Sequence, residues 1–171
     1  MNASPAVNNL GGSLWHRWDL HFHTPASFDY EDGNVSNRQI VDGLVAERVR
    51  VVAITDHHVI DVARIRKLQE LGAGQLTILP GIEFRDEHGD EPIHYISIFP
   101  EDCDLEHVWT TVQGTLGLTA AGIMEKGGED KVYVPIGEGA KLTRELKGVV
   151  SIHAGSKSNS IEEIKNSEQF Q

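Results

Sequence analysis

The chain has 171 residues, of which 39% are hydrophobic and 24% are charged, a composition typical of one globular domain with a buried core. Its net charge of -11 argues against a broadly basic nucleic-acid-binding surface, although bound metal ions could supply local positive charge. A single cysteine excludes an internal disulfide, and no apolar run has membrane-spanning length. We therefore expect a cytoplasmic protein with a flexible polar lead-in over 1–13 and one domain over 14–171.

Strand and helix signals alternate along the chain. Apolar runs predict strands over 14–22, 49–55, 76–79, 94–99 and 149–153. Helical spacing and capping signals predict helices over 36–48, 61–71, 105–116 and 138–146, with a further capping box at 160–163. This alternation is typical of an α/β fold with a parallel sheet or barrel.

Histidines and carboxylates fall at the ends of these predicted strands. Two histidines lie one residue apart at the end of the first strand, so their side chains would project from the same face. In an α/β barrel the carboxyl ends of the strands form the active-site face, so we expect side chains from five segments to converge there. The residues concerned are His21, His23, Asp56, His57, Glu83 and His153, with His94 at the start of its strand after a hairpin-like turn.

Such a set of residues is suited to binding divalent metal ions. Imidazole and carboxylate ligands together bind zinc, manganese or iron. Two or three such ions can polarise a phosphoryl oxygen and lower the pKa of a bound water. Glu83 could bridge two ions, which imidazole does not normally do. A lone histidine or aspartate would more simply be a solvated loop residue, so the prediction of a metal site depends on the whole set.

The motifs that carry these residues resemble those of the PHP (polymerase and histidinol phosphatase) family. They are Asp19-Leu20-His21-Phe22-His23-Thr24, Ile54-Thr55-Asp56-His57, Pro80-Gly81-Ile82-Glu83 and His153 at a strand end. The resemblance spans residues 19 to 153. It implies a distorted (β/α)7 barrel with a trinuclear site of zinc, manganese or iron, and hydrolysis of phosphoesters such as histidinol phosphate, nucleotides or DNA 3′ ends.

The resemblance also implies roles for individual residues. His21 and His23 would hold one ion, and Glu83 would bridge it to a second. His94 and His153 would complete the ligands of the second ion.

A third ion would be served by His57. Asp29 takes the place at which many family members have a further histidine, and it is also a competent ligand. Asp56 would be either a ligand or a residue that orients its neighbours. The expected catalytic residues are Glu83, His21, His23 and Asp56.

Three histidines match no motif and are expected at the surface, namely His58, His88 and His107.

One departure from the family concerns the end of the barrel. The family closes its barrel with a late Asp-x-His motif, and no such motif follows His153. We therefore expect a barrel truncated at its C-terminal end, and an isolated chain that binds metals incompletely and is weakly active or inactive. Missing strands would leave an open sheet edge, which favours self-association.

A narrower resemblance is carried by residues 15–27 and 152–158. These segments look like the N-terminal PHP domain of large bacterial PHP–ATPase proteins, which are similar to SMC-type DNA-repair ATPases and in part linked to phage defence. This resemblance implies a nuclease module, a C-terminal ATPase region as partner, and DNA or RNA as substrate. Lys157 would lie near a substrate phosphate, or else be a solvated loop lysine. The sequence has no phosphate-binding Gly-x-x-x-x-Gly-Lys-Ser/Thr loop.

Three alternatives remain open at this point. The acidic composition favours a small-molecule phosphatase of the histidinol-phosphate or nucleotide type over a nuclease. An amidohydrolase barrel also begins with His-x-His, but it usually has a lysine where Glu83 stands and leaves Thr55-Asp56-His57 unexplained. A non-catalytic or regulatory module that keeps the barrel for binding is the third alternative.

Overall fold

The computed structural model describes residues 16–87 and 92–153, except for the side chain of His153. Its strands are β1 (Arg17–Phe22), β2 (Val49–Ile54), β3 (Thr77–Asp86), β4 (Ile93–Ile98) and β5 (Val149–His153). Its helices are α1 (Asn37–Ala46), α2 (Val62–Gly72), α3 (Leu105–Leu116), α4 (Ala120–Glu125) and α5 (Ile136–Glu145), with a 3-10 turn η1 (Glu129–Lys131). None of the helices within the described ranges combines the length and apolar character needed to cross a membrane.

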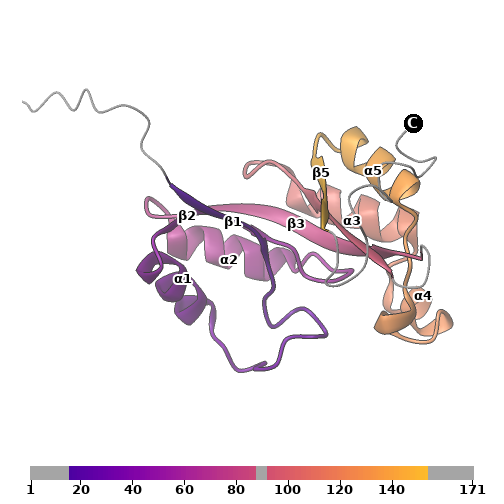
Figure 1. Ribbon diagram of the computed structural model, residues 1–171, viewed down its shortest axis with the longest axis horizontal. Helices are drawn as coiled ribbons and strands as arrows, with labels where there is room; N and C mark the ends of the chain where they lie inside the picture. Colours follow the sequence, from indigo (N-terminus) through magenta and orange to yellow (C-terminus); the bar gives the residue numbers. More distant parts are fainter. Residues whose placement is uncertain (1–15, 88–91, 154–171) are drawn as a thin grey trace, which may run out of the picture.

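The five strands form one curled, half-barrel sheet in the order β1-β2-β3-β4-β5, with the helices packed against it (Figure 1). β1 and β2 are parallel, as are β2 and β3, whereas β4 runs antiparallel to both β3 and β5. The predicted α/β class is therefore confirmed, but the sheet is mixed and not wholly parallel. Only residues 87–92 separate β3 from β4, too few for the crossover that a parallel pair needs, so this pair is antiparallel. The full (β/α)7 barrel stays a prediction.

β3 is longer than its sequence predicts. The apolar run indicated a strand over 76–79 that would end before Pro80 and Gly81, but the strand continues to Asp86. Its first half pairs with β2 and its second half with β4, so each half has a partner. The Pro80 carbonyl accepts a hydrogen bond of 2.8 Å from the Phe99 amide. A Cβ at Gly81 would lie 2.8 Å from Thr55 Cγ2, so only glycine lets the strands approach this closely.

The helix starts follow from local capping. Ser36 forms the predicted capping box with Gln39 at the start of α1, and Asp61 accepts a hydrogen bond of 2.9 Å from the Arg64 amide at the start of α2. The prediction of 105–116 matches α3, and α5 begins slightly before its predicted start. No helix was predicted at α4, where the sequence is glycine-rich. The predicted capping box at 160–163 lies outside the described residues.

The two faces of the sheet differ in character because side chains alternate along each strand. On the outer face, Ile82 and Phe84 of β3 are buried with side chains of α1, α2, α3 and α5 in the main hydrophobic core. On the inner face a smaller cluster contains Ala53 and Ile96. Glu83 is directly opposite Ile96 in the β3–β4 register, and therefore belongs to this inner face.

Candidate metal centre

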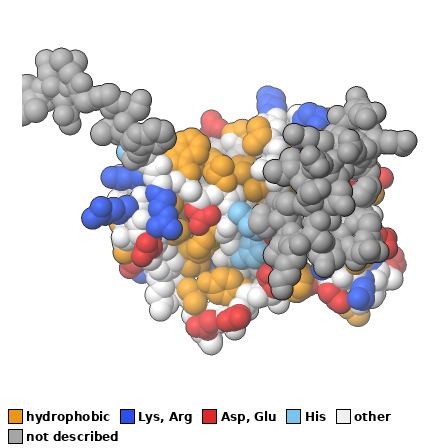
Figure 2. Space-filling view, viewed as in Figure 1, with side chains coloured by type: hydrophobic (Ala, Val, Ile, Leu, Met, Phe, Trp, Pro, Cys, Tyr) orange, Lys and Arg blue, Asp and Glu red, His pale blue; other side chains and the backbone are white. Residues whose placement is uncertain are grey.

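The inner face carries a group of histidines near the ends of β1 and β2 and near the start of β4. Figure 2 shows histidine side chains gathered near the middle of one face of the molecule, with hydrophobic side chains beside them. His23 follows the end of β1, and His57 follows β2. His94 comes from the opposite chain direction, since it lies at the start of the antiparallel β4. All three histidines surround the carboxylate of Glu83.

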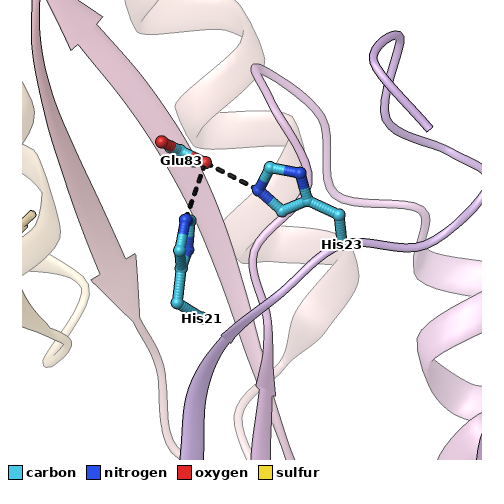
Figure 3. A group of neighbouring side chains, drawn as sticks. All are labelled: His21, His23 and Glu83. Atoms are coloured by element: carbon cyan, nitrogen blue, oxygen red, sulfur yellow. Dashed lines mark hydrogen bonds and ion pairs between the residues drawn. The ribbon is translucent and has the colours of Figure 1, made fainter. Parts of the chain in front are cut away.

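Glu83 is the centre of this group and is only 1% exposed. Its Oε2 lies 2.7 Å from His23 Nε2, 3.4 Å from His21 Nε2 and 3.6 Å from His57 Nε2. Its Oε1 lies 2.5 Å from His94 Nδ1. The two oxygens of one carboxylate thus face different histidines, and Figure 3 shows His21 and His23 directed at the first of them.

The charge state of this group follows from burial and mutual contact. Burial alone would raise the pKa of Glu83, but the hydrogen bonds from His23 and His94 hold it well below its usual range. Burial alone would lower the pKa of His23, but the hydrogen bond and the charge of Glu83 raise it. Burial lowers the pKa of His57 to about 4, so this imidazole is neutral near pH 7. A neutral imidazole and an ionised carboxylate are the forms that bind metal ions.

Asp29 lies on the solvent side of the group, in the loop that follows β1. Its Oδ1 is 3.3 Å from His23 Nδ1, and its Oδ2 is 3.5 Å from His57 Nε2. Burial alone would raise its pKa, but the Ser27 hydroxyl, which donates a hydrogen bond of 2.5 Å, and the two histidines lower it. Its side chain is 41% exposed, in contrast to Glu83. Asp29 is therefore an ionised carboxylate at the open edge of the cluster.

Ligand atoms lying within 4.8 Å of one another form three overlapping groups that could hold a metal ion. The groups are His21–His23–Glu83, His23–Asp29–His57 and His57–Glu83–His94. Each pair of groups shares one residue. A carboxylate can bridge two ions through its two oxygens, whereas a neutral imidazole has one lone pair to offer. The first and third groups share only Glu83, so these two can be filled together, and the residues present fit a pair of divalent ions.

Two threonines form hydrogen bonds that position groups beside the candidate ligands. The hydroxyl of Thr55 lies 2.9 Å from His21 Nδ1, which leaves His21 Nε2 directed at Glu83. A partner on the far ring nitrogen fixes the orientation of a metal-binding histidine. Thr24, directly after His23, donates its amide and its hydroxyl to the two oxygens of Asp56, at 2.5 and 2.8 Å.

Asp56 therefore tethers the chain at His23. It is 1% exposed, and burial raises its pKa to about 6, against the hydrogen bonds from Thr24. It belongs to none of the three candidate groups within the described ranges. Of the two roles foreseen for Asp56, this position suits the orienting one.

The structure places the other predicted residues as follows. The backbone of His153 pairs with His94 across β4 and β5, which brings it to the same end of the sheet. Lys157, His88 and the side chain of His153 lie outside the described residues. His107 is exposed on α3, as predicted. The prediction for His58 is wrong, because this side chain is only 1% exposed.

His58 is buried because of the backbone that follows His57. Its φ of 57° is left-handed, and its amide donates a hydrogen bond of 2.9 Å to the Glu83 carbonyl. This tight turn directs the ring inward, 6.4 Å from the ring of Phe84. Burial lowers the pKa of His58 to about 3, so the ring is neutral near pH 7.

Sequence reasoning did not assign roles to Thr24 and Thr55. The one signal available was their position, since Thr24 directly follows His23 and Thr55 directly precedes Asp56. Threonine is common at strand ends, so position alone does not distinguish a supporting hydroxyl from an ordinary one.

Comparison with known proteins supports the fold. The sequence matches no protein-family profile and no curated protein. Among solved structures, an amidohydrolase from Chromobacterium violaceum, determined with bound sulfate and no metal, superposes with a TM-score of 0.57 at 14% identity, covering 86% of this chain and 70% of its own. A protein named as a metal-dependent phosphoesterase from Bifidobacterium adolescentis superposes with a TM-score of 0.54 at 17% identity, covering 86% and 72%. At these identities the likeness establishes a shared fold.

Proposed function

We propose that this chain is a metal-dependent phosphoesterase domain that binds two divalent ions around Glu83. The observation that carries the proposal is the position of Glu83, whose Oε2 faces His21, His23 and His57 while its Oε1 faces His94. The fold likeness to a protein named as a metal-dependent phosphoesterase supports the same class. Zinc, manganese and iron all accept this set of ligands.

In this proposal each ion has its own set of ligands, and the two sets share Glu83. His21, His23 and Glu83 hold one ion, and Glu83 holds the second with His57 and His94. Bound divalent ions would supply a water of lowered pKa and a Lewis acid for the phosphoryl oxygen. Thr55 orients His21 through its hydroxyl.

Buried neutral histidines limit the negative charge that an incoming phosphate meets. Asp29, at the open edge, would hold an ion with His23 and His57 only in place of one of these two ions, because each imidazole offers one lone pair. His153, whose backbone pairs with His94, is the further ligand proposed for the second ion.

Within this class, we propose a nuclease module next to an ATPase region as the finer assignment. Support comes from the sequence resemblance of residues 15–27 and 152–158 to PHP–ATPase proteins. The net charge of -11 favours the alternative, a small-molecule phosphatase, because no broad basic surface attracts a polyanion.

The test is hydrolysis of matched substrates by protein reconstituted with manganese, zinc or iron. The panel contains bis(p-nitrophenyl) phosphate, p-nitrophenyl phosphate, single-stranded and duplex DNA, RNA, histidinol phosphate and an N-acyl amino acid. His23→Ala removes a ligand, and His107→Ala removes an exposed histidine of α3 as the matched control.

The substrates that are cleaved distinguish between the candidate functions. Phosphoester cleavage that is lost in His23→Ala but kept in His107→Ala supports the proposal, and the preferred phosphoester separates nuclease from phosphatase. Cleavage of the amide alone would support the amidohydrolase alternative, which is the class named for the Chromobacterium protein of similar fold. Metal binding with no hydrolysis of any substrate would contradict the proposal and favour a non-catalytic module.

A further inference from the structure

Arg85 is a cation beside the candidate metal centre. It lies two residues after Glu83 on β3, so both side chains project from the inner face of the sheet. In the β3–β4 register Arg85 is directly opposite His94, whose ring contacts Glu83. Arg85 lies outside the sequence motifs that resemble the PHP family.

Two aromatic rings and one carbonyl hold the guanidinium in place. Its Cζ is 5.7 Å from the centroid of the Phe28 ring and 5.7 Å from that of Tyr133. One terminal nitrogen, Nη2, donates a hydrogen bond of 3.0 Å to the Glu129 carbonyl. The Phe28 ring also lies 5.1 Å from the ring of His57, so it connects the arginine to the metal-ligand group. Arg85 is thus fixed at the edge of the cluster.

The charge of Arg85 has no carboxylate partner within 4.0 Å in the parts of the chain that the structure describes. Its Nε is buried and without an acceptor among those same residues. By contrast, Arg17, Arg38, Arg64 and Arg66 each form an ion pair. Glu83, the neighbouring carboxylate on the strand, already faces the histidines.

A fixed guanidinium next to divalent ions is stabilised by an anion that contacts both. Two cationic groups at short range repel each other, and an oxyanion that contacts both removes this repulsion. The planar guanidinium offers paired N–H donors that match the oxygens of a phosphate. Nη2 of Arg85 donates one N–H to the Glu129 carbonyl, and the terminal nitrogens carry further N–H groups.

We propose that Arg85 binds the non-bridging oxygens of the substrate's phosphoryl group beside the metal centre. The inference rests on the proposed function, because it assigns to Arg85 the phosphate on which that centre would act. Arg85 would then bind the substrate in addition to linking β3 to Glu129 through its hydrogen bond.

The experiment is calorimetric titration of inorganic phosphate into metal-loaded protein, with phosphoester hydrolysis measured in parallel. The variants are Arg85→Gln, Arg85→Lys and, as a matched control, Arg50→Gln. Arg50 is also a strand arginine that donates one hydrogen bond to a backbone carbonyl, that of Gln75 at 3.1 Å, but it is exposed on β2. Metal content and Tm are recorded for every variant.

We expect Arg85→Gln to weaken phosphate binding by roughly 10- to 100-fold with unchanged metal content, because a charged hydrogen-bond donor is lost. Arg85→Lys should weaken it less, since the charge remains and the paired donors are lost. Arg50→Gln should match the wild type. In hydrolysis, the Arg85 variants should raise KM more than they lower kcat.

Two results would overturn this inference. One is phosphate binding by Arg85→Gln as tight as by Arg50→Gln, which would leave Arg85 a purely structural tie. The other is a metal-loaded wild type that binds no phosphate at all. If Arg85→Gln does not fold, Arg85→Lys decides by the same comparison. A wild type that binds phosphate through Arg85 yet cleaves no phosphoester would contradict the proposed function and leave the anion site standing.

Discussion

Glu83 and His94 meet diagonally across the β3–β4 pair, with Glu83 Oε1 2.5 Å from His94 Nδ1. They are not register partners, because His94 is opposite Arg85 and Glu83 is opposite Ile96. Diagonal neighbours on one face of an antiparallel pair are within reach of long side chains. The reversal of the chain after β3 therefore brings the start of β4 to the end of the sheet where β1 and β2 finish.

This relationship predicts that His94 serves only one of the two ions. In His94→Ala the His57–Glu83–His94 group loses a ligand, while His21–His23–Glu83 stays complete. We expect calorimetric titration of the metal-free variant with zinc or manganese to show one tight site where the wild type shows two. His107→Ala should behave as the wild type. Loss of both sites, or of neither, would be inconsistent with separate groups joined by Glu83.

Thr55 is expected to matter for metal affinity without being a ligand. Thr55→Val removes the hydroxyl at 2.9 Å from His21 Nδ1 and keeps nearly the same volume. Loss of a partner that orients a metal-binding histidine typically weakens metal affinity by about 10- to 100-fold. Thr55→Ser keeps the hydroxyl and should stay close to the wild type in a competition assay with a chelating dye. Equal affinities for the valine and serine variants would rule out this supporting role.

The passage of β3 between its two partners predicts a cost for any side chain at Gly81. In Gly81→Ala the new Cβ would lie 2.8 Å from Thr55 Cγ2 and 2.9 Å from the Ser97 carbonyl oxygen. Strain of this kind costs roughly 1–3 kcal/mol, and urea unfolding of the metal-free protein would measure it.

Gly43→Ala is the matched control for this substitution. Gly43 lies inside α1, where a Cβ would meet nothing beyond the helix's own backbone within 4 Å, so alanine should stabilise the protein by about 0.5–1 kcal/mol. If Gly81→Ala were as stable as Gly43→Ala, the close approach of β3 to Thr55 would not exist in solution.

Much of the fold could be predicted because its signals are local. The capping box at Ser36 and the helical spacing over 105–116 act within a few residues, and both predictions match the structure. The β-branched run of β2 likewise identifies a buried strand. The ends of the predicted strands then indicate that His23 and His57 lie near one another, and their ring centroids are 4.9 Å apart.

The remaining features depend on residues distant in sequence. Pro80 and Gly81 indicate a strand end locally, yet β3 continues because β2 and β4 pair with its successive halves. His58 is buried because its backbone turns into the left-handed region and bonds to Glu83, which no neighbouring residue specifies. Arg85 gains its significance only from Phe28 and Tyr133, which approach it from other parts of the chain.

The central claim is that one buried carboxylate, Glu83, joins two metal ions, and metal content per chain tests it most directly. Elemental mass spectrometry would be applied to the wild type, to Glu83→Gln and to the exposed-site control Glu101→Gln, after reconstitution and removal of free metal. We predict two or more zinc, manganese or iron ions per chain in the wild type and in Glu101→Gln, and at most one in Glu83→Gln, in which only the His23–Asp29–His57 group keeps all its ligands. A wild type without bound metal, or a Glu83→Gln variant with the same metal content as the wild type, would contradict the account.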